Sequence, residues 1–195
     1  MTTATTESWH RLQRWDAGNP APALEPELWT QALIRADRLH LAYRLSWDPE
    51  RWPLVLFADK GVDVADPQRL DGLWQHTCFE AFVGVVGVSG YWEFNVSPAG
   101  DWNVYRFSGY RTGQSLELAY GTLPLSVSVQ PGLLQLELCC SMPPTLHGQF
   151  KAGTGLELGL TAVLEVQGGE LSYWALEHAG QEPDFHDRRS WVMRL

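Results

Sequence analysis

The sequence predicts an all-β domain, a jelly-roll-like antiparallel β-sandwich with a short N-terminal helix. Apolar and polar residues alternate with a period of two over most of the chain. Short turn sequences rich in Gly, Pro, Asp and Ser separate the alternating segments. Helical spacing is seen at 26–36, where Leu28, Trp29, Ala32 and Leu33 recur on one helix face. About nine or ten short strands are typical of a two-sheet sandwich or a barrel.

The first half of the chain contains the clearest strand pattern. Every second residue from Leu39 to Trp47 is apolar, and the residues between are polar or small. Turn residues and acids fill 59–72, so we expect a loop there. The connection Gly87–Gly90 is short enough for a hairpin, and SPAGD favours a second tight turn. These signals predict strands at 39–47, 76–86, 91–96 and 102–107, and an apolar run at 54–57.

The second half continues the alternation. Turns are expected at Pro131–Gly132 and Gly168–Gly169. The charge-free stretch 118–136 is long enough to raise the question of a membrane span, but it contains Gly and Pro and alternates polar with apolar residues. We therefore expect strands there and no membrane association. The predicted strands are 123–129, 134–140, 156–164, 171–176 and 191–195.

Composition narrows the classes of function. The chain has 195 residues, 45% hydrophobic and 19% charged, which is typical of one globular domain. Acidic residues outnumber basic ones by 23 to 14, so nucleic acid and anionic membranes are disfavoured as partners. Cys78, Cys139 and Cys140 match neither a disulfide framework nor a zinc site, and indicate free thiols. The first residues resemble no secretory signal, so we expect a cytoplasmic protein.

Catalytic motifs are absent from the sequence. It contains no GxSxG, no HExxH and no glycine-rich phosphate loop, which disfavours a nucleotide-using enzyme. His76 and Cys78 lie two residues apart on one predicted strand, with no third group to orient the imidazole. Packing is the favoured interpretation of Cys78. Whether the protein is an enzyme stays open, with the balance toward a non-catalytic role.

Some polar and aromatic residues suggest a ligand site. Glu80 lies among apolar residues in HTCFEAFVGV, where a carboxylate is costly to bury unless it is paired or faces a ligand; an outward-facing position is the equal alternative. The ten tryptophans offer rings that stack on sugars, although most tryptophans in a sandwich serve packing. Arg106 follows Tyr105 and suits sugar hydroxyls or an acid across the sheet. His186 and its acidic neighbours favour a surface loop over a metal site.

Three blocks of sequence resemble a known family. They are LWQHTCFEAFVGV, YWEFNVSPAGDWNVYRFSGYR and SYWALEHAGQEPDFHDRRSWVMRL, which together occupy 73–111 and 172–195. The blocks resemble DOMON-like proteins related to the family 9 carbohydrate-binding modules. The earlier segment IRADRLHLAYRLSWDPE extends the resemblance over most of 34–195. It implies an antiparallel sandwich at 34–195. Residues 1–33 lie outside the resemblance, and we expect them to form an N-terminal extension with the short helix.

The resemblance also implies a binding site in which two aromatic rings clamp a sugar. Trp74, six residues before Glu80, matches the first ring, and Phe185 occupies the place of the second. Glu80 falls at the position of an acid that binds sugar hydroxyls. His76 stands where the family has a glutamine, and Asn95 where it has an arginine, for which Arg106 could compensate. The leading hypothesis is a non-catalytic module that binds a sugar or a sugar-like molecule.

Three other functions are retained as alternatives. A haem-binding domain would use Met142 or Met193 with a histidine, and is disfavoured because neither has a recognisable ligand context. A glycan-acting enzyme would use Glu80 and Asp184 as acid and base. A protein-interaction domain would expose an aromatic surface to an unknown partner. No cofactor is expected, although calcium is kept open for the loop Asp59–Asp66.

Overall fold

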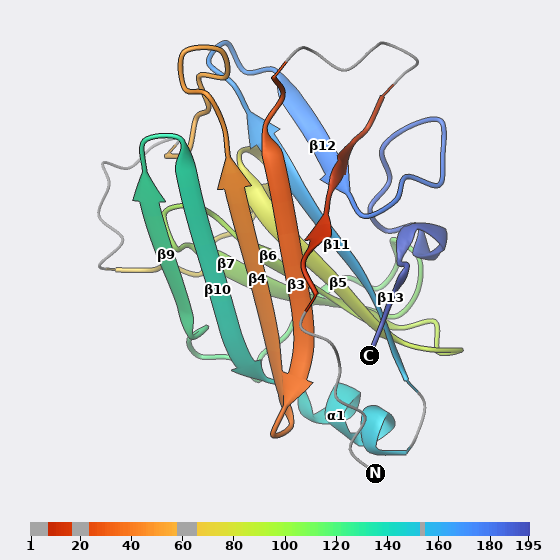
Figure 1. The fold of residues 1–195 in the computed structure, drawn as a ribbon. Helices are drawn as coiled ribbons and strands as arrows, with labels where there is room; N and C mark the ends of the chain where they lie inside the picture. The colour runs from red at the N-terminus through yellow and green to blue at the C-terminus, as the bar shows by residue number, and fades with distance from the viewer. Residues whose placement is uncertain (1–7, 17–23, 58–65, 153–154) are drawn as a thin grey trace.

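The computed structural model describes residues 8–16, 24–57, 66–152 and 155–195, and these form two packed antiparallel sheets (Figure 1). The smaller sheet has five strands in the order β1-β3-β4-β10-β9: His10–Arg11, Glu27–Arg35, Arg38–Ser46, Leu133–Ser141 and Leu125–Gln130. The larger sheet has eight strands. Seven follow the order β2-β12-β11-β5-β6-β7-β8: Gln13–Arg14, Leu171–Ala175, Leu156–Glu165, Cys78–Val85, Tyr91–Val96, Trp102–Phe107 and Ser115–Leu116. The eighth, β13 (Met193–Arg194), pairs with β11 outside this order. The predicted β-sandwich is confirmed.

Alternation along the strands creates the core between the two sheets. Leu41 and Leu45 of β4 are buried on the inner face of the smaller sheet, and Phe79 and Val83 of β5 are buried on the inner face of the larger. Side chains from both sheets join in one continuous hydrophobic cluster. Burial of this apolar surface is the main driving force for the packing of the two layers. The strands predicted at 39–47, 76–86, 91–96 and 102–107 are confirmed as β4, β5, β6 and β7.

The predicted N-terminal helix is wrong. Residues Glu27–Arg35 form strand β3, in which Leu28, Thr30 and Ala32 are buried and the residues between them are less so. The alternation was hidden in the sequence because Thr30 is polar and Ala32 is small. Thr30 is tolerated inside because its hydroxyl donates a hydrogen bond to the carbonyl of Ala42 at 3.0 Å. The expected boundary between residues 33 and 34 falls within this strand.

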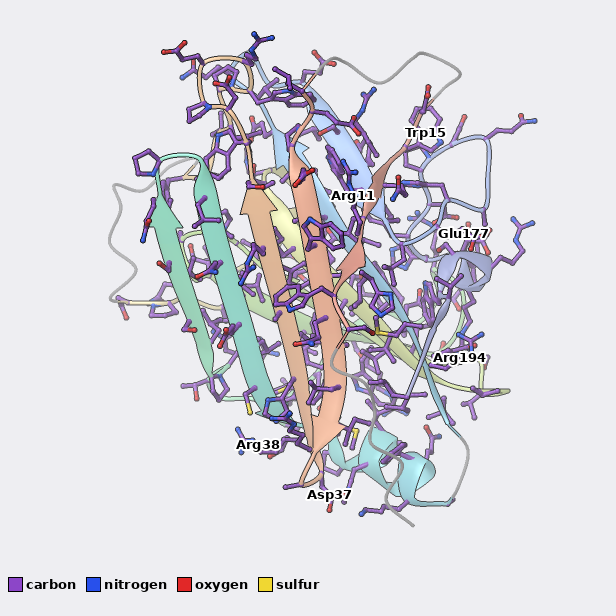
Figure 2. The ribbon with its side chains drawn as sticks, viewed as in Figure 1. Arg11, Trp15, Asp37, Arg38, Glu177 and Arg194 are labelled. Atoms are coloured by element: carbon purple, nitrogen blue, oxygen red, sulfur yellow. The ribbon has the colours of Figure 1, made fainter. Side chains whose placement is uncertain are left out.

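A tight turn and a short helix close one end of the sandwich. Ala36 and Asp37 join β3 to β4 with positive φ at both positions, and Asp37 marks this end in Figure 2. The helix α1 (Pro144–Lys151), which sequence analysis did not predict, begins with Pro144 at its first turn and buries Leu146 in the core. Lys151 Nζ lies 2.6 Å from a carboxylate oxygen of Asp37, so the helix is tied to the turn.

The outer face of the larger sheet is also covered. Every residue of β5 is buried, although its inner face alone packs in the main core. On the outer face, Phe82, Tyr91, Phe107 and Trp191 form a second aromatic cluster, against which Phe185 packs. The C-terminal segment, dark blue in Figure 1, therefore forms a partial third layer over this sheet. No helix in the described parts of the chain is long and apolar enough to cross a membrane.

Candidate functional site

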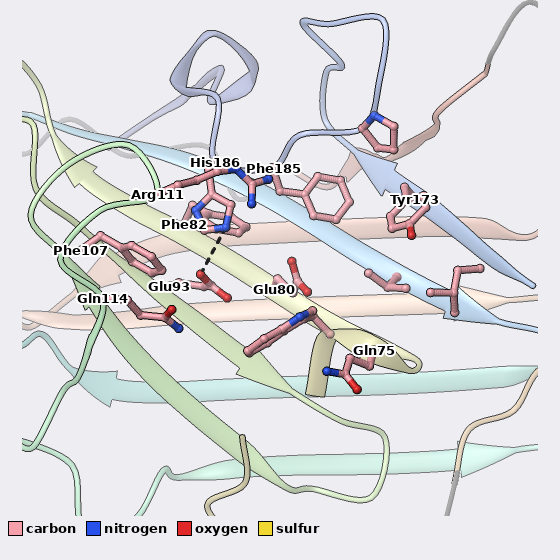
Figure 3. A pocket seen from close by; sticks show the side chains of 14 residues that line it. Gln75, Glu80, Phe82, Glu93, Phe107, Arg111, Gln114, Tyr173, Phe185 and His186 are labelled. Carbon is pink, nitrogen blue, oxygen red and sulfur yellow. Dashed lines mark ion pairs between the residues drawn. The ribbon is translucent and has the colours of Figure 1, made fainter. Parts of the chain in front are cut away.

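A pocket of about 550 Å³ opens on the outer face of the eight-stranded sheet. Its base is formed by β5 and β6, and one side by β12 and the C-terminal segment. The short 3₁₀ turn η1 (Leu73–Gln75) and the segment after β7 contribute the remaining lining. Figure 3 shows side chains from these separate segments converging on one space. A pocket of this volume is in the range that binds small molecules.

Aromatic rings line the pocket from two distant segments. Trp74 is 36% exposed and meets the ring of Tyr105 edge to face at 5.8 Å. Phe185 meets Tyr173 in the same geometry at 6.1 Å, and Figure 3 shows these two rings on one wall. Because Trp74 is partly exposed and Phe185 is half-buried, both rings can still contact a ligand. The structure thus brings both residues predicted for an aromatic clamp to one pocket.

The pocket contains two buried carboxyl groups, those of Glu80 and Glu93. Their side chains share the outer face of the sheet, because Glu80 pairs with Asn95 in the register of β5 and β6 and Glu93 lies two residues from Asn95. The two residues are only 3% and 5% exposed. Asn95 donates a hydrogen bond to Glu93 Oε1 at 2.7 Å, and Thr161 donates a long one to Glu80 Oε2 at 3.4 Å. Glu80 Oε1 has no hydrogen-bond partner in the described part of the chain.

Burial makes these two carboxyl groups weaker acids than exposed glutamates. Desolvation, and then the nearby charge of Glu93, raises the pKa of Glu80 well above its usual value. Desolvation also raises the pKa of Glu93, to about 7. The pair is therefore partly protonated near neutral pH. A protonated carboxyl donates a hydrogen bond as well as accepting one, so the pair can serve ligands of either kind.

A hydrogen-bonded rim holds the C-terminal segment against the pocket. Asp184 accepts hydrogen bonds from the hydroxyl of Tyr110 at 2.5 Å and from Arg111 Nη2 at 2.8 Å. His186 follows two residues later. Its Nδ1 lies 2.7 Å from the hydroxyl of Tyr91, and its Nε2 lies 3.8 Å from Glu93 Oε2. Burial, and then the charge of Arg111, lowers the pKa of His186 to about 4, so its ring is neutral at pH 7.

The remaining predicted residues lie outside the lining of this pocket. Asn95 is fully buried and reaches the pocket only through its bond to Glu93. His76 Nδ1 lies 2.8 Å from Glu165 Oε2 and faces a second cavity beyond the η1 turn. Arg106 pairs with Trp92 in the strand register and lies over its ring at 5.6 Å. Because side chains alternate along a strand, Trp92 and Arg106 lie on the face of the sheet opposite to Glu93.

Four further pocket residues were not among the predicted ligand-binding residues: Glu93, Arg111, Tyr173 and His186. Glu93 could have been found by pairing β6 with β5, because the alternation in YWEFNV places it on the face of Glu80. The family resemblance places Phe185 at the site, but no local residue pattern predicts that residues 183–186 fold back over β5. This segment was expected to be a surface loop, whereas His186 is half-buried against Phe82 at 5.0 Å between ring centroids.

The residues that sequence analysis considered for a metal ion, haem or catalysis lie as follows. Within the described residues, no group of three His, Cys, Asp or Glu side chains is arranged to hold a metal ion. The segment considered for calcium, Asp59–Asp66, lies outside the described residues except for Asp66. Met142 is buried in the main core and Met193 packs against it. Asp184, considered as a catalytic partner of Glu80, does not line the pocket, and its carboxylate binds Tyr110 and Arg111.

The two sheets and the covered outer face define a β-sandwich with a small-molecule-sized pocket. The fold is similar to the crystal structure of a candidate carbohydrate-binding protein from Bacteroides uniformis, with a TM-score of 0.64 and 15% sequence identity, over 95% of this chain and 84% of that one. Two structures of a family 9 carbohydrate-binding module from Caldicellulosiruptor kristjanssonii, with cellotriose and with glucose, match with a TM-score of 0.47 at 10% and 12% identity. These cover 88% of this chain and 73% and 75% of theirs. No protein-family model and no curated protein matches the sequence.

Proposed function

We propose that the protein binds a carbohydrate in the pocket over β5 and β6, without catalysing a reaction on it. The observation that supports this most directly is the combination of exposed ring surface at Trp74 and Phe185 with the buried carboxyl of Glu80. A sugar ring has an apolar C–H face and a rim of hydroxyls, and so requires both kinds of group. The fold shared with the Bacteroides uniformis protein agrees with this proposal.

The polar groups of the pocket suit hydroxyl recognition. Glu80 Oε1 is buried and unpaired, so a ligand hydroxyl that donates to it replaces a missing hydrogen bond. Gln75 and Gln114 also line the pocket, and their amides can both donate and accept (Figure 3). An aromatic clamp made by Trp74 and Phe185, and a DOMON-like relationship, stay predictions within this proposal.

Hydrolysis is not part of the proposal. A glycosidase requires two carboxyl groups on opposite sides of the scissile bond. The pair considered for this role was Glu80 with Asp184, but Asp184 is bound by Tyr110 and Arg111 and does not line the pocket. This finding does not support Glu80 and Asp184 as an acid and base pair.

Calorimetric titration with glucose, cellobiose and other mono- and disaccharides tests the proposal. We expect saturable binding that quenches or shifts tryptophan fluorescence, and a loss of at least about tenfold in affinity for Trp74→Ala, which corresponds to roughly 1.4 kcal/mol. Trp9→Ala is the matched control. Trp9 has nearly the same exposure, 37%, but stacks with Arg44 of the other sheet.

The two tryptophan variants separate the outcomes. Affinity retained in Trp74→Ala, or lost equally in Trp9→Ala, would place the binding site elsewhere. An absence of binding over the whole panel would overturn the proposed function. Circular dichroism of each variant establishes that the sheet structure is intact before the affinities are compared.

A further inference from the structure

The charges of the pocket are unbalanced toward the acidic side. Glu80 and Glu93 are buried together, and the basic side chains in the pocket lining are His186 and Arg111, whose charge also acts on Glu93. Arg111 directs its guanidinium Nη2 to Asp184 at 2.8 Å, and His186 is neutral at pH 7 because burial lowers its pKa to about 4. A buried carboxylate without a cation is costly, unless a ligand supplies the positive charge.

The unpaired polar atoms around the two acids are acceptors. Glu80 Oε1 and Asn95 Oδ1 are buried and have no hydrogen-bond partner in the described residues. Glu93 Oε2 lies 3.8 Å from Nε2 of the neutral His186 ring, beyond hydrogen-bond distance. An ammonium group donates three hydrogen bonds and accepts none, whereas a hydroxyl donates only one. The excess of acceptors therefore matches an ammonium group better than a hydroxyl.

The walls of the pocket also suit a cation. Trp74, Phe185 and Tyr173 line the space above the two acids, and Phe82 lies beside Glu80 on the same face of β5. The faces of aromatic rings attract ammonium groups, most strongly where water is excluded. Rings and carboxyl groups together form the usual environment for a bound organic cation.

We propose that the carbohydrate ligand carries a basic amino group, and that this ammonium binds between Glu80 and Glu93 in the manner of an ion pair. The inference rests on the proposed function, and it names an amino sugar as the ligand class. Within the pocket, the ring would stack on the aromatic walls while the ammonium supplies the donors that the buried oxygens lack.

Binding of an amino sugar is expected to release a proton from the acid pair. Because burial raises the pKa of Glu93 to about 7, an ammonium that binds beside it must displace a proton from the partly protonated pair. Affinity for the amine should therefore rise as the pH increases from about 5.5 to about 7. Other titratable or charged groups lie around the pair on every side: Tyr43, Asp71, Cys78, Tyr91, Tyr105, Arg111, Asp184 and His186.

Titration of the intact protein with glucosamine, glucose and N-acetylglucosamine tests the inference. We expect glucosamine to bind at least about tenfold more tightly than glucose at neutral pH, and acetylation of the amine to abolish this advantage. Repeating the glucosamine titration in buffers of different ionisation enthalpy should reveal proton release. Glu93→Gln should lower the affinity for glucosamine by a larger factor than the affinity for glucose, and should abolish the proton release.

Glu137→Gln is the matched control for Glu93→Gln, because Glu137 is an exposed acid on β10 of the other sheet. It should leave the preference for glucosamine unchanged. Equal affinity for glucose and glucosamine would overturn the amino-sugar inference and leave the proposed function standing. Binding of none of the three sugars, with none bound in the wider panel, would overturn both. If Glu93→Gln proves poorly folded, the comparison of the three sugars on the intact protein and the proton release on glucosamine binding still decide the inference.

Discussion

Glu80 and Glu93 extend from neighbouring antiparallel strands onto the same covered face of the larger sheet, where burial and mutual repulsion disfavour their ionised forms. The sheet register makes this closeness unavoidable, because Phe82 pairs with Glu93 while Glu80 pairs with Asn95. Two acids in such a position destabilise the fold once they ionise. Their position in a pocket with aromatic walls is the basis of the inference that the ligand is an amino sugar.

The buried acids should make stability fall as the pH rises. Glu93 has an ordinary pKa of 4.5 and a pKa of about 7 in the fold, so between these values the unfolded chain loses its proton while the folded chain keeps it. The free energy of unfolding therefore decreases through this range. We expect Glu93→Gln to be more stable than wild type at about pH 8 by on the order of 3 kcal/mol, and nearly equal at about pH 5.

Urea unfolding of both proteins across this pH range checks the prediction. His186 changes the free energy of unfolding with pH in the opposite direction to Glu93. Because both proteins contain His186, its contribution cancels when they are compared at the same pH. Because burial lowers the pKa of His186 to about 4, its contribution is present above its ordinary value of 6.5 and is lost as the pH falls toward 4. A difference between Glu93→Gln and wild type that does not change with pH would contradict the prediction.

Asp184 should act on ligand affinity through the segment that holds Phe185. Burial favours the neutral form of Asp184, but hydrogen bonds from Tyr110 and Arg111 outweigh this and keep its pKa below the usual value. Asp184→Asn weakens these bonds and loosens the neighbouring ring. We expect a fall in sugar affinity of about three- to tenfold, with the β-sheet signal retained in circular dichroism.

Asp48→Asn is the control for Asp184→Asn, since Asp48 forms an exposed pair with Arg51 at 3.4 Å and does not line the pocket. Its affinity should equal that of the wild type, because exposed pairs contribute little. Unchanged affinity in Asp184→Asn would show that the rim does not position Phe185.

Gly159 should be required for the position of the C-terminal layer. A Cβ atom at Gly159 would lie 2.4 Å from Trp191 Cδ1, inside the contact distance. Trp191 Nε1 also donates a hydrogen bond to the carbonyl of Phe185 at 2.8 Å, so displacement of the indole moves the pocket wall. We expect Gly159→Ala to lower the free energy of unfolding by about 1–3 kcal/mol and to weaken sugar binding.

Gly148→Ala provides the control for Gly159→Ala in thermal and urea unfolding. Gly148 lies within α1, and a Cβ atom there has no heavy atom within 4 Å. Alanine favours a helix over glycine by about 1 kcal/mol, so this variant should be equally or more stable. A Gly159→Ala protein as stable as Gly148→Ala would contradict the packing described for Trp191.

The three thiols should differ sharply in reactivity. Cys78 is fully buried, and burial raises its pKa well above the usual value; burial also raises the pKa of Cys140, to about 11. Cys139 is only half-buried. We expect a thiol reagent to modify one cysteine of the folded chain quickly, at Cys139, and all three after unfolding. Rapid modification of two or three thiols in the native protein would contradict this.

Much of the sandwich was predictable because strands of this chain mostly follow a simple alternation. Leu39–Trp47 and the hairpin around Gly87–Gly90 show an unbroken period of two and a clear turn. The alternation failed as a guide at β3, where the buried face includes polar Thr30 and small Ala32. It also could not predict α1, a helix of eight residues that depends on burial of Leu146.

The candidate site was predictable only in part. Trp74, Glu80 and Phe185 were recognised from sequence blocks and do line one pocket. Arg106 was chosen for its chemistry alone, but its parity on β7 places it on the other face from Glu93. The face on which a side chain lies follows from its position along the strand. Pairing β6 with β7 would therefore have excluded Arg106 from the pocket face.

By itself, the amino-acid sequence determined that this chain is an all-β sandwich, because alternation and turn residues act over a few neighbouring positions. Only the tertiary structure decided that Phe185 and His186 fold back over β5 and that Glu93 joins Glu80 in one pocket. The first contact joins residues about a hundred positions apart, whereas Glu80 and Glu93 are brought together by the pairing of two neighbouring strands. These contacts depend on the register of paired strands and on the path of an irregular segment, which no local pattern specifies.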